Sequence, residues 1–140
     1  MTRTRTAGAV TACLTAALLA GCTTGTSDAS QLAGRSFEST DVTGTSLVDG
    51  TVVRLIVGED GSVSLHAGCN TLVGDATWSD GTLAVPLLAS TRMACDEALA
   101  AQDRWLTAFL EASPPFDLDG DTLTLGEGDE QITLTDVAAS

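Results

Sequence analysis

The residues best suited to chemistry lie together in the segment HAGCNTLVGD, residues 66 to 75. This segment holds the chain's only histidine, His66, and one of its four cysteines, Cys69, which is followed by Asn70. A cysteine close to a histidine can act as a nucleophile, bind a metal ion or form half of a disulfide. The three alternatives predict an enzyme, a metal-binding protein and a non-catalytic binding domain, respectively.

The spacing of these residues argues against a nucleophile. A cysteine nucleophile needs a base within hydrogen-bond reach. His66 precedes Cys69 by three residues, which along an extended strand is a separation of about 10 Å with the side chains on opposite faces. No serine-centred nucleophile motif is evident either. We therefore expect no catalytic residue, and a cysteine-dependent hydrolase is the weakest alternative.

The metal-binding alternative has too few ligands. His66 and Cys69 supply two, where a structural zinc site takes four. The stretch DLDGD offers carboxylates at residues 117, 119 and 121, but its glycine at residue 120 comes too early for an EF-hand loop, and residue 128, where the closing glutamate belongs, is glycine. A hairpin turn with solvated acids explains the same residues. We expect no bound metal and no other cofactor.

Residues 1–21 have the layout of a lipoprotein signal peptide. Arg3 and Arg5 precede an uncharged run over residues 7–20 that is too short for a comfortable membrane span. The following LAGC, residues 19–22, resembles the lipobox of bacterial lipoproteins, where cleavage precedes the cysteine. The resemblance implies lipid on Cys22, a flexible tether over residues 22–32 and a folded domain over residues 33–140. The expected location is extracytoplasmic, lipid-anchored to the cell membrane of a bacterium.

Counting the cysteines then favours a disulfide. Cys13 leaves with the signal peptide and Cys22 carries the lipid, so Cys69 and Cys95 remain as an even pair in an oxidising compartment. Closing that loop is worth about 3.5 kcal/mol by the chain-entropy estimate. We expect a disulfide between Cys69 and Cys95.

The charge of the chain excludes one class of partner. The formal net charge is −13, and no lysine is present. Removal of the signal peptide takes away two of the six arginines and none of the nineteen acids. With so few cations to neutralise phosphates, we expect no nucleic-acid binding. A solubilising acidic surface is the favoured interpretation, ahead of a cation-collecting role.

Turn signals and alternating strands predict a mainly β domain. Asp-Gly pairs at residues 49–50, 60–61, 80–81 and 119–120 each predict a hairpin turn. Alternation in DTLTL and QITLT predicts that Leu123, Leu125, Ile132 and Leu134 face the core. The fold class expected is α+β, mainly β: a small antiparallel curved sheet or barrel-like meander with one amphipathic helix packed on it.

The helix is expected over residues 96–112. Leu99, Leu106, Phe109 and Leu110 fall on its apolar face, with Trp105 at the edge and Asp103, Arg104 and Glu111 on the polar side. Asp96 is placed to cap its N-terminus, and the two prolines at residues 114 and 115 stop it.

These motifs together resemble the META domain. GCNTLVGD is followed by LASTRMAC, the amphipathic helix and the closing GDTLTL hairpin, as in the family that includes HslJ-like heat-shock lipoproteins. The resemblance covers residues 34 to 135 and implies a small β-barrel-like fold with a packed helix. It also implies an envelope protein linked to stress, without an agreed activity, substrate or cofactor. In the first strand the family usually has a tryptophan after its first glycine, whereas Arg35 follows Gly34 here.

The function expected is therefore a non-enzymatic binding or interaction module of the cell envelope. Its partners would be the membrane, through lipid on Cys22, and an unidentified envelope protein or component. Asn70 and Arg92 are the candidate contacts, although a turn residue and an internal ion pair are their ordinary structural roles. The main alternative is a small-ligand binder that uses the mouth of a β-barrel-like domain.

Overall fold

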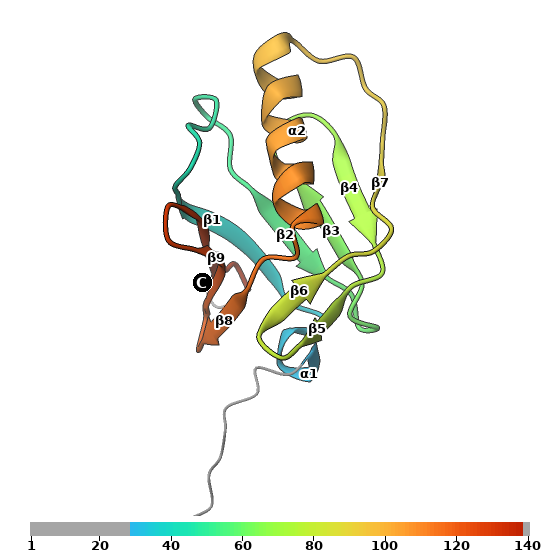
Figure 1. Cartoon of the computed structure of the whole chain (residues 1–140), viewed down its shortest axis with the longest axis vertical. Helices are drawn as coiled ribbons and strands as arrows, with labels where there is room; N and C mark the ends of the chain where they lie inside the picture. The colour runs from blue at the N-terminus through green and yellow to red at the C-terminus, as the bar shows by residue number, and fades with distance from the viewer. Residues whose placement is uncertain (1–28, 139–140) are drawn as a thin grey trace, which may run out of the picture.

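The computed structural model describes residues 29–138 (Figure 1). The predicted signal peptide, the lipid site Cys22 and residues 22–28 of the predicted tether lie outside the described residues. The packed chain begins before the expected boundary at residue 33, because residues 29–32 form a short helix in which Leu32 is fully buried. No helix among the described residues is long and apolar enough to cross a membrane.

Short strands dominate the chain, and one long helix interrupts them. The elements are α1 (Ala29–Leu32), β1 (Ser36–Val42), β2 (Arg54–Val57), β3 (Val63–His66), β4 (Thr71–Gly74), β5 (Thr77–Ser79), β6 (Thr82–Ala84), β7 (Ala89–Ser90), α2 (Glu97–Glu111), β8 (Phe116–Asp119), β9 (Thr122–Glu127) and β10 (Glu130–Asp136).

Eight strands form one antiparallel sheet in the order β7-β4-β3-β2-β1-β10-β9-β8, and β5 pairs with β6 in a separate hairpin. The sheet curves around one side of α2 (Figure 1). The expected fold class is thus confirmed. Because β7 and β8 are two free ends of the sheet order, the architecture is an open curved sheet and not a closed barrel.

The predicted core positions are confirmed in the hairpin of β9 and β10. Leu123 pairs across the strands with Leu134, and Leu125 pairs with Ile132. All four side chains are fully buried, as period-two alternation over one wet and one dry face requires.

The Asp-Gly turns behave as expected at three of the four positions. Gly61, Gly81 and Gly120 have positive φ angles and join β2 to β3, β5 to β6 and β8 to β9. Asp49 and Gly50 differ, because they lie within the long connection between the antiparallel neighbours β1 and β2 and do not form a tight turn that joins the two strands directly. Here the turn is local, closed by a hydrogen bond from the Thr51 N–H to the Val48 carbonyl, and no strand continues from either side of it.

Helix α2 is capped and stopped as predicted. The Asp96 carboxylate accepts a hydrogen bond from the N–H of Leu99 at 3.0 Å. Leu106, Phe109 and Leu110 are buried. The assignment of Asp103 to the polar side was wrong, because its side chain is only 8% exposed.

The first and last of the described strands, β1 and β10, pair inside the sheet. Phe37 of β1 is fully buried. The Arg35 guanidinium lies over its ring, 4.9 Å from the centroid, and forms ion pairs with Asp136 and Asp121. Asp121 of the DLDGD stretch thus lies in the turn between β8 and β9, where it pairs with Arg35.

Candidate functional site

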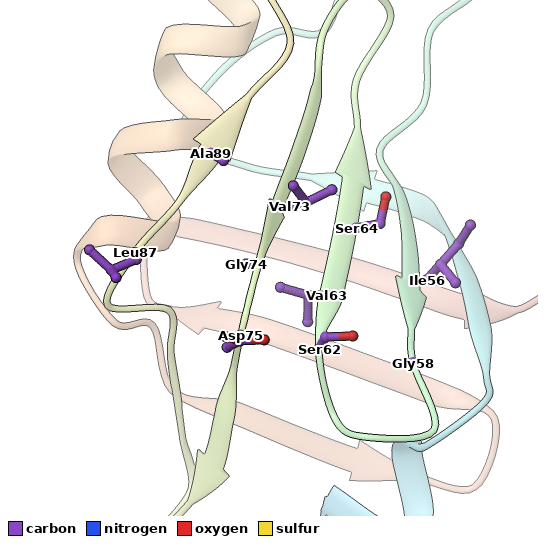
Figure 2. A pocket seen from close by; sticks show the side chains of 10 residues that line it. All are labelled: Ile56, Gly58, Ser62, Val63, Ser64, Val73, Gly74, Asp75, Leu87 and Ala89. Atoms are coloured by element: carbon purple, nitrogen blue, oxygen red, sulfur yellow. The ribbon is translucent and has the colours of Figure 1, made fainter.

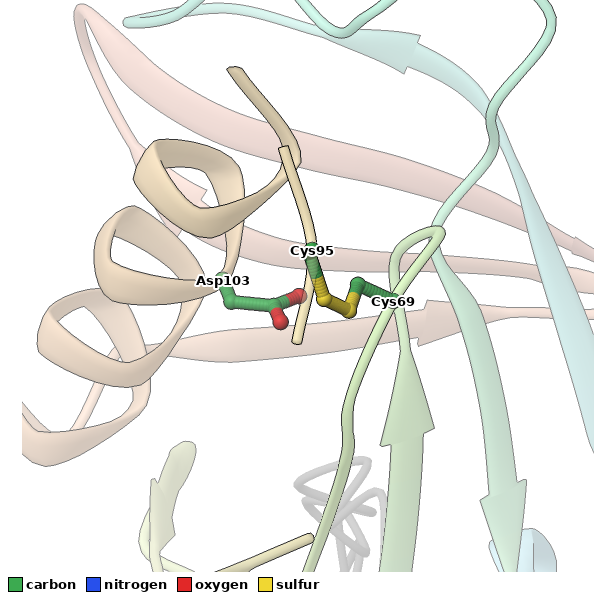
Figure 3. Close-up of side chains that lie close together, drawn as sticks. All are labelled: Cys69, Cys95 and Asp103. Carbon is green, nitrogen blue, oxygen red and sulfur yellow. A yellow bond between two sulfur atoms is a disulfide. The ribbon is translucent and has the colours of Figure 1, made fainter. Parts of the chain in front are cut away.

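The candidate site lies where β3, β4 and the start of α2 meet, and it brings together His66, Cys69, Asn70 and Cys95. Cys69 follows β3, and Cys95 precedes α2. The two are joined in a disulfide with a Cα–Cα distance of 6.2 Å (Figure 3). The expected disulfide is present in the structure, and a sulfur bonded in this way is not available as a thiolate nucleophile.

A buried carboxylate lies beside the disulfide. Asp103 of α2 points toward the two sulfurs (Figure 3), and one ligand atom from each of Cys69, Cys95 and Asp103 falls within a 4.8 Å cluster. Cysteine ligates metals as the thiolate. While the two sulfurs are bonded to each other, the cluster offers only a single carboxylate, so we assign no metal to it.

Asn70 connects the elements around the disulfide. Its Oδ1 accepts hydrogen bonds from the Thr91 hydroxyl at 3.0 Å and from the Met93 N–H at 2.8 Å. Its Nδ2 and its backbone N–H both donate to Oδ2 of Asp103, at 2.8 and 2.9 Å. The amide is thus engaged at both ends in holding the fold together, and its contact with a partner stays a prediction.

Asp103 is the residue that sequence reasoning missed at this site. A signal was present, because Asp103 lies four residues after Leu99 and three before Leu106, the spacings that place side chains on one helix face. A carboxylate on an apolar face needs a partner inside the fold. That partner is Asn70, from a loop far away in the sequence.

His66 is an ordinary strand residue here. It ends β3 with an exposed side chain. Its Nδ1 lies 3.1 Å from the carbonyl oxygen of Asn70. This contact helps to shape the turn that precedes β4.

Arg92 differs from the other arginines of the domain. Arg35, Arg54 and Arg104 each form an ion pair with an acid. Arg92 is exposed and has no hydrogen bond or ion pair within residues 29–138. The expectation of an internal ion pair was therefore wrong for Arg92, and its side chain remains available to a partner.

The segment around Arg92 is also unusually open. Residues 89–94 are all exposed. Leu87 and Met93, at 84% and 65% exposure, are the two most exposed large apolar side chains in the described chain. Apolar side chains, methionine and arginine gathered on one exposed segment are typical of a protein contact surface.

Two surface hollows lie on either side of β7. One, of about 450 Å³, lies on the outer face of the sheet (Figure 2) and includes the cross-strand row Ile56, Ser64, Val73 and Ala89, with Leu87 at its side. The other, of about 380 Å³, lies between β7 and α2 and is lined by Ser90, Asp103, Thr107, Glu111 and their neighbours.

Two properties of the outer hollow suit it to contact with an apolar surface. Ser64 and Ala89 are small, whereas Ile56 and Val73 are large and about half exposed. The β2–β3 turn beside it is held by Asp60, whose pKa is lowered from its usual value by hydrogen bonds from the Ser62 hydroxyl and N–H. The outer hollow is therefore open to solvent, presents the apolar side chains of Ile56 and Val73, and is bordered by a turn that hydrogen bonds hold in place.

The fold and the site define a class: a small disulfide-bonded antiparallel β domain with one packed helix and an exposed edge segment. The chain belongs to the META domain family, whose model matches residues 30–139. The resemblance seen in the sequence is thereby confirmed.

Two solved structures share this fold. One NMR structure is 27% identical, with a TM-score of 0.62, and the match covers 76% of this chain and 92% of the other. An NMR structure of a protein from Burkholderia xenovorans is 20% identical, with a TM-score of 0.60, covering 77% of this chain and 85% of that one. No curated protein matches the chain.

Proposed function

We propose that this META domain is an exported, lipid-anchored module of the cell envelope that acts by binding another component and not by catalysis. The observation that carries the proposal is the disulfide between Cys69 and Cys95. It holds the sulfur of Cys69, the candidate nucleophile, in a covalent bond, and disulfides are typical of oxidising compartments. The LAGC motif ahead of the domain supports anchoring through Cys22.

The alternative of a small-ligand binder has less support. Such a protein needs an enclosed cavity of some hundreds of Å³. The interior of this sheet is filled by a continuous cluster of buried apolar side chains from both of its halves and from α2. The hollows beside β7 are open surface features, which suit contact with a macromolecule better than enclosure of a small molecule.

Anchoring is tested by metabolic labelling with an alkyne fatty acid in a bacterial host. We expect label and membrane attachment for the natural chain, loss of both for Cys22→Ala, and retention of both for Cys13→Ala. Cys13 is the matched control because it lies in the predicted signal peptide. A Cys22→Ala protein that still carries label and sediments with membranes would contradict the anchoring.

The binding role is tested on the purified domain. Intact mass with and without alkylation, under non-reducing conditions, should show no free thiol at Cys69 or Cys95. Two free thiols would restore the cysteine-hydrolase alternative. The immobilised domain should then retain a component of envelope extracts that a disulfide-bonded control domain does not retain.

A further inference from the structure

We propose that the exposed edge of β7 binds an extended segment of a partner protein by strand addition, with apolar partner side chains at alternate positions and a carboxylate that meets Arg92. The proposal rests on the binding function proposed above and names its surface and the chemistry of its partner.

The backbone of β7 presents unused hydrogen-bonding groups. Hydrogen-bonded and non-hydrogen-bonded residue pairs alternate along an antiparallel ladder. The Thr91 N–H donates to the Thr71 carbonyl at 3.1 Å, so the next pair in register, Leu72 with Ser90, is a non-hydrogen-bonded pair. The N–H and carbonyl of Ser90 therefore face away from β4. Since β7 ends the sheet order, they face no further strand.

The edge lacks most of the features by which sheets protect their edges. Natural edge strands are very short, or carry lysine, proline, inward charges or a covering loop, and of these features β7 has the short length, two residues. Here β7 is exposed, the chain contains no lysine, and the side chains nearest to the strand include the exposed Leu87 and Ala89. Pro86 lies before the strand and blocks none of its outward groups. An open edge with an exposed apolar side chain beside it can pair with an added strand.

The two hollows supply places for the side chains of an added strand. Successive side chains of a strand point to opposite faces of the sheet. Alternate partner side chains would therefore lie toward the outer hollow beside Val73, Leu87 and Ala89 (Figure 2), and the intervening ones toward the hollow beside Ser90 and α2. The outer set meets an apolar surface and is expected to be apolar, whereas the other set meets polar side chains.

Charge decides among the possible occupants. Arg92 is the one arginine of the described residues without an ion pair, and a guanidinium binds a carboxylate through two parallel hydrogen bonds. A partner carboxylate beyond the end of β7 would complete it. A second copy of this chain fits poorly, since the full sequence has a net charge of −13 and like charges oppose association.

The test uses two synthetic peptides of about ten residues that alternate valine with threonine. One carries a single glutamate at its N-terminus and the other carries a single glutamate at its C-terminus. Binding is measured by isothermal titration and by amide chemical-shift changes in the oxidised domain. We expect at least one peptide to bind and to move the amides of residues 88–92. The same peptide with alternate backbone N–H groups methylated keeps its side chains and should not bind.

Two variants separate backbone pairing from charge. Ser90→Pro removes an outward N–H that the β4 ladder does not use, and we expect it to weaken peptide binding at least about tenfold. Arg92→Gln should weaken binding about threefold to tenfold, with the smaller salt dependence that follows from loss of an exposed pair. Arg54→Gln is the matched control, because Arg54 is an exposed arginine of β2 already paired with Glu38, and it should bind as the natural domain does.

Several outcomes would overturn the inference. They are no binding by any of the peptides at millimolar concentration, equal binding by the methylated peptide, or a concentration-dependent dimer that is lost in Ser90→Pro. If Ser90→Pro fails to fold, Arg92→Gln and the methylated peptide still decide. If both variants capture an envelope component as well as the natural domain does, strand addition at the edge of β7 is refuted and the proposed function stands. Peptide binding by a chain that is never lipidated or exported would refute the proposed anchoring and leave binding at the edge of β7 standing.

Discussion

The hydrogen bonds of Asn70 make the sharpest prediction about stability. Asn70→Ala removes the hydrogen bonds that Oδ1 accepts from the Thr91 hydroxyl and the Met93 N–H, and the one that Nδ2 donates to the buried Asp103. A neutral hydrogen bond contributes about 0.5–1.5 kcal/mol net, and one to a charged group about 1.5–3 kcal/mol. The exposed Thr91 hydroxyl can turn to water, so we expect a loss of about 2–4 kcal/mol, dominated by Asp103 and Met93.

The assay is urea unfolding of the oxidised domain, followed by tryptophan fluorescence. In thermal unfolding, the same loss of stability would lower the melting temperature by about 10–25 °C for a domain of this length. Gln131→Ala is the control, since the Gln131 side chain of β10 makes no hydrogen bond to the described residues. If Asn70→Ala and Gln131→Ala lie within about 0.5 kcal/mol of each other, the stabilising role given to Asn70 is refuted.

A second substitution tests the direction of the same interaction. Asn70→Asp keeps the shape of the side chain and places a second carboxylate where Nδ2 now lies 2.8 Å from Asp103. Two carboxylates at this distance raise the pKa of one of them in the folded state. The variant should therefore be least stable at neutral pH and regain stability as the pH falls through that raised pKa, because one carboxyl then takes a proton and donates it as the amide did. A pH-independent loss would contradict the geometry.

Two further predictions concern the disulfide and the β2–β3 turn. Replacing both Cys69 and Cys95 with serine should lower the free energy of unfolding by about 3.5 kcal/mol, measured by urea unfolding, and an unchanged midpoint would show that the bond does not constrain the unfolded chain. The Asp60 carboxyl should titrate in NMR spectra with a pKa below its usual value, since the Ser62 hydroxyl and N–H both donate to this carboxylate. Ser62→Ala should move the pKa of Asp60 upward. The matching stability is present above the unfolded pKa of Asp60 and is lost as the pH falls through the folded one, so a Ser62→Ala domain with the same Asp60 pKa would contradict this account.

Local patterns predicted the elements and failed where long-range contacts decide. The cap at Asp96 and the inward faces of β9 and β10 follow from spacing within single segments, and both are confirmed. Asp49 and Gly50 carry the same turn chemistry as the real hairpins. They belong to a long connection because a turn residue fixes a local bend and does not decide whether strands continue on both sides.

The site was predictable only in part for the same reason. Counting cysteines was enough to propose the bond between Cys69 and Cys95. The burial of Asp103 depends on Asn70, which lies 33 residues away in the sequence, and no pattern within the helix names that partner. Arg92 was expected to be paired because the domain is rich in acids. Pairing requires an acid at the right place in space, and Arg35 has two such acids while Arg92 has none in the described chain.

The pairing of β1 with β10 has a consequence for how the chain reaches its folded state. These strands are the first and the last of the described chain, and Phe37 lies opposite Asp136 in the ladder between them. Within the sheet, the halves β1 to β4 and β8 to β10 are joined by strand pairing only at this seam. Contacts so far apart in sequence close late and fold slowly. The sheet cannot be completed until residues 130–136 are available, so a chain synthesised from its N-terminus would assemble this domain only after nearly all of it had emerged from the ribosome.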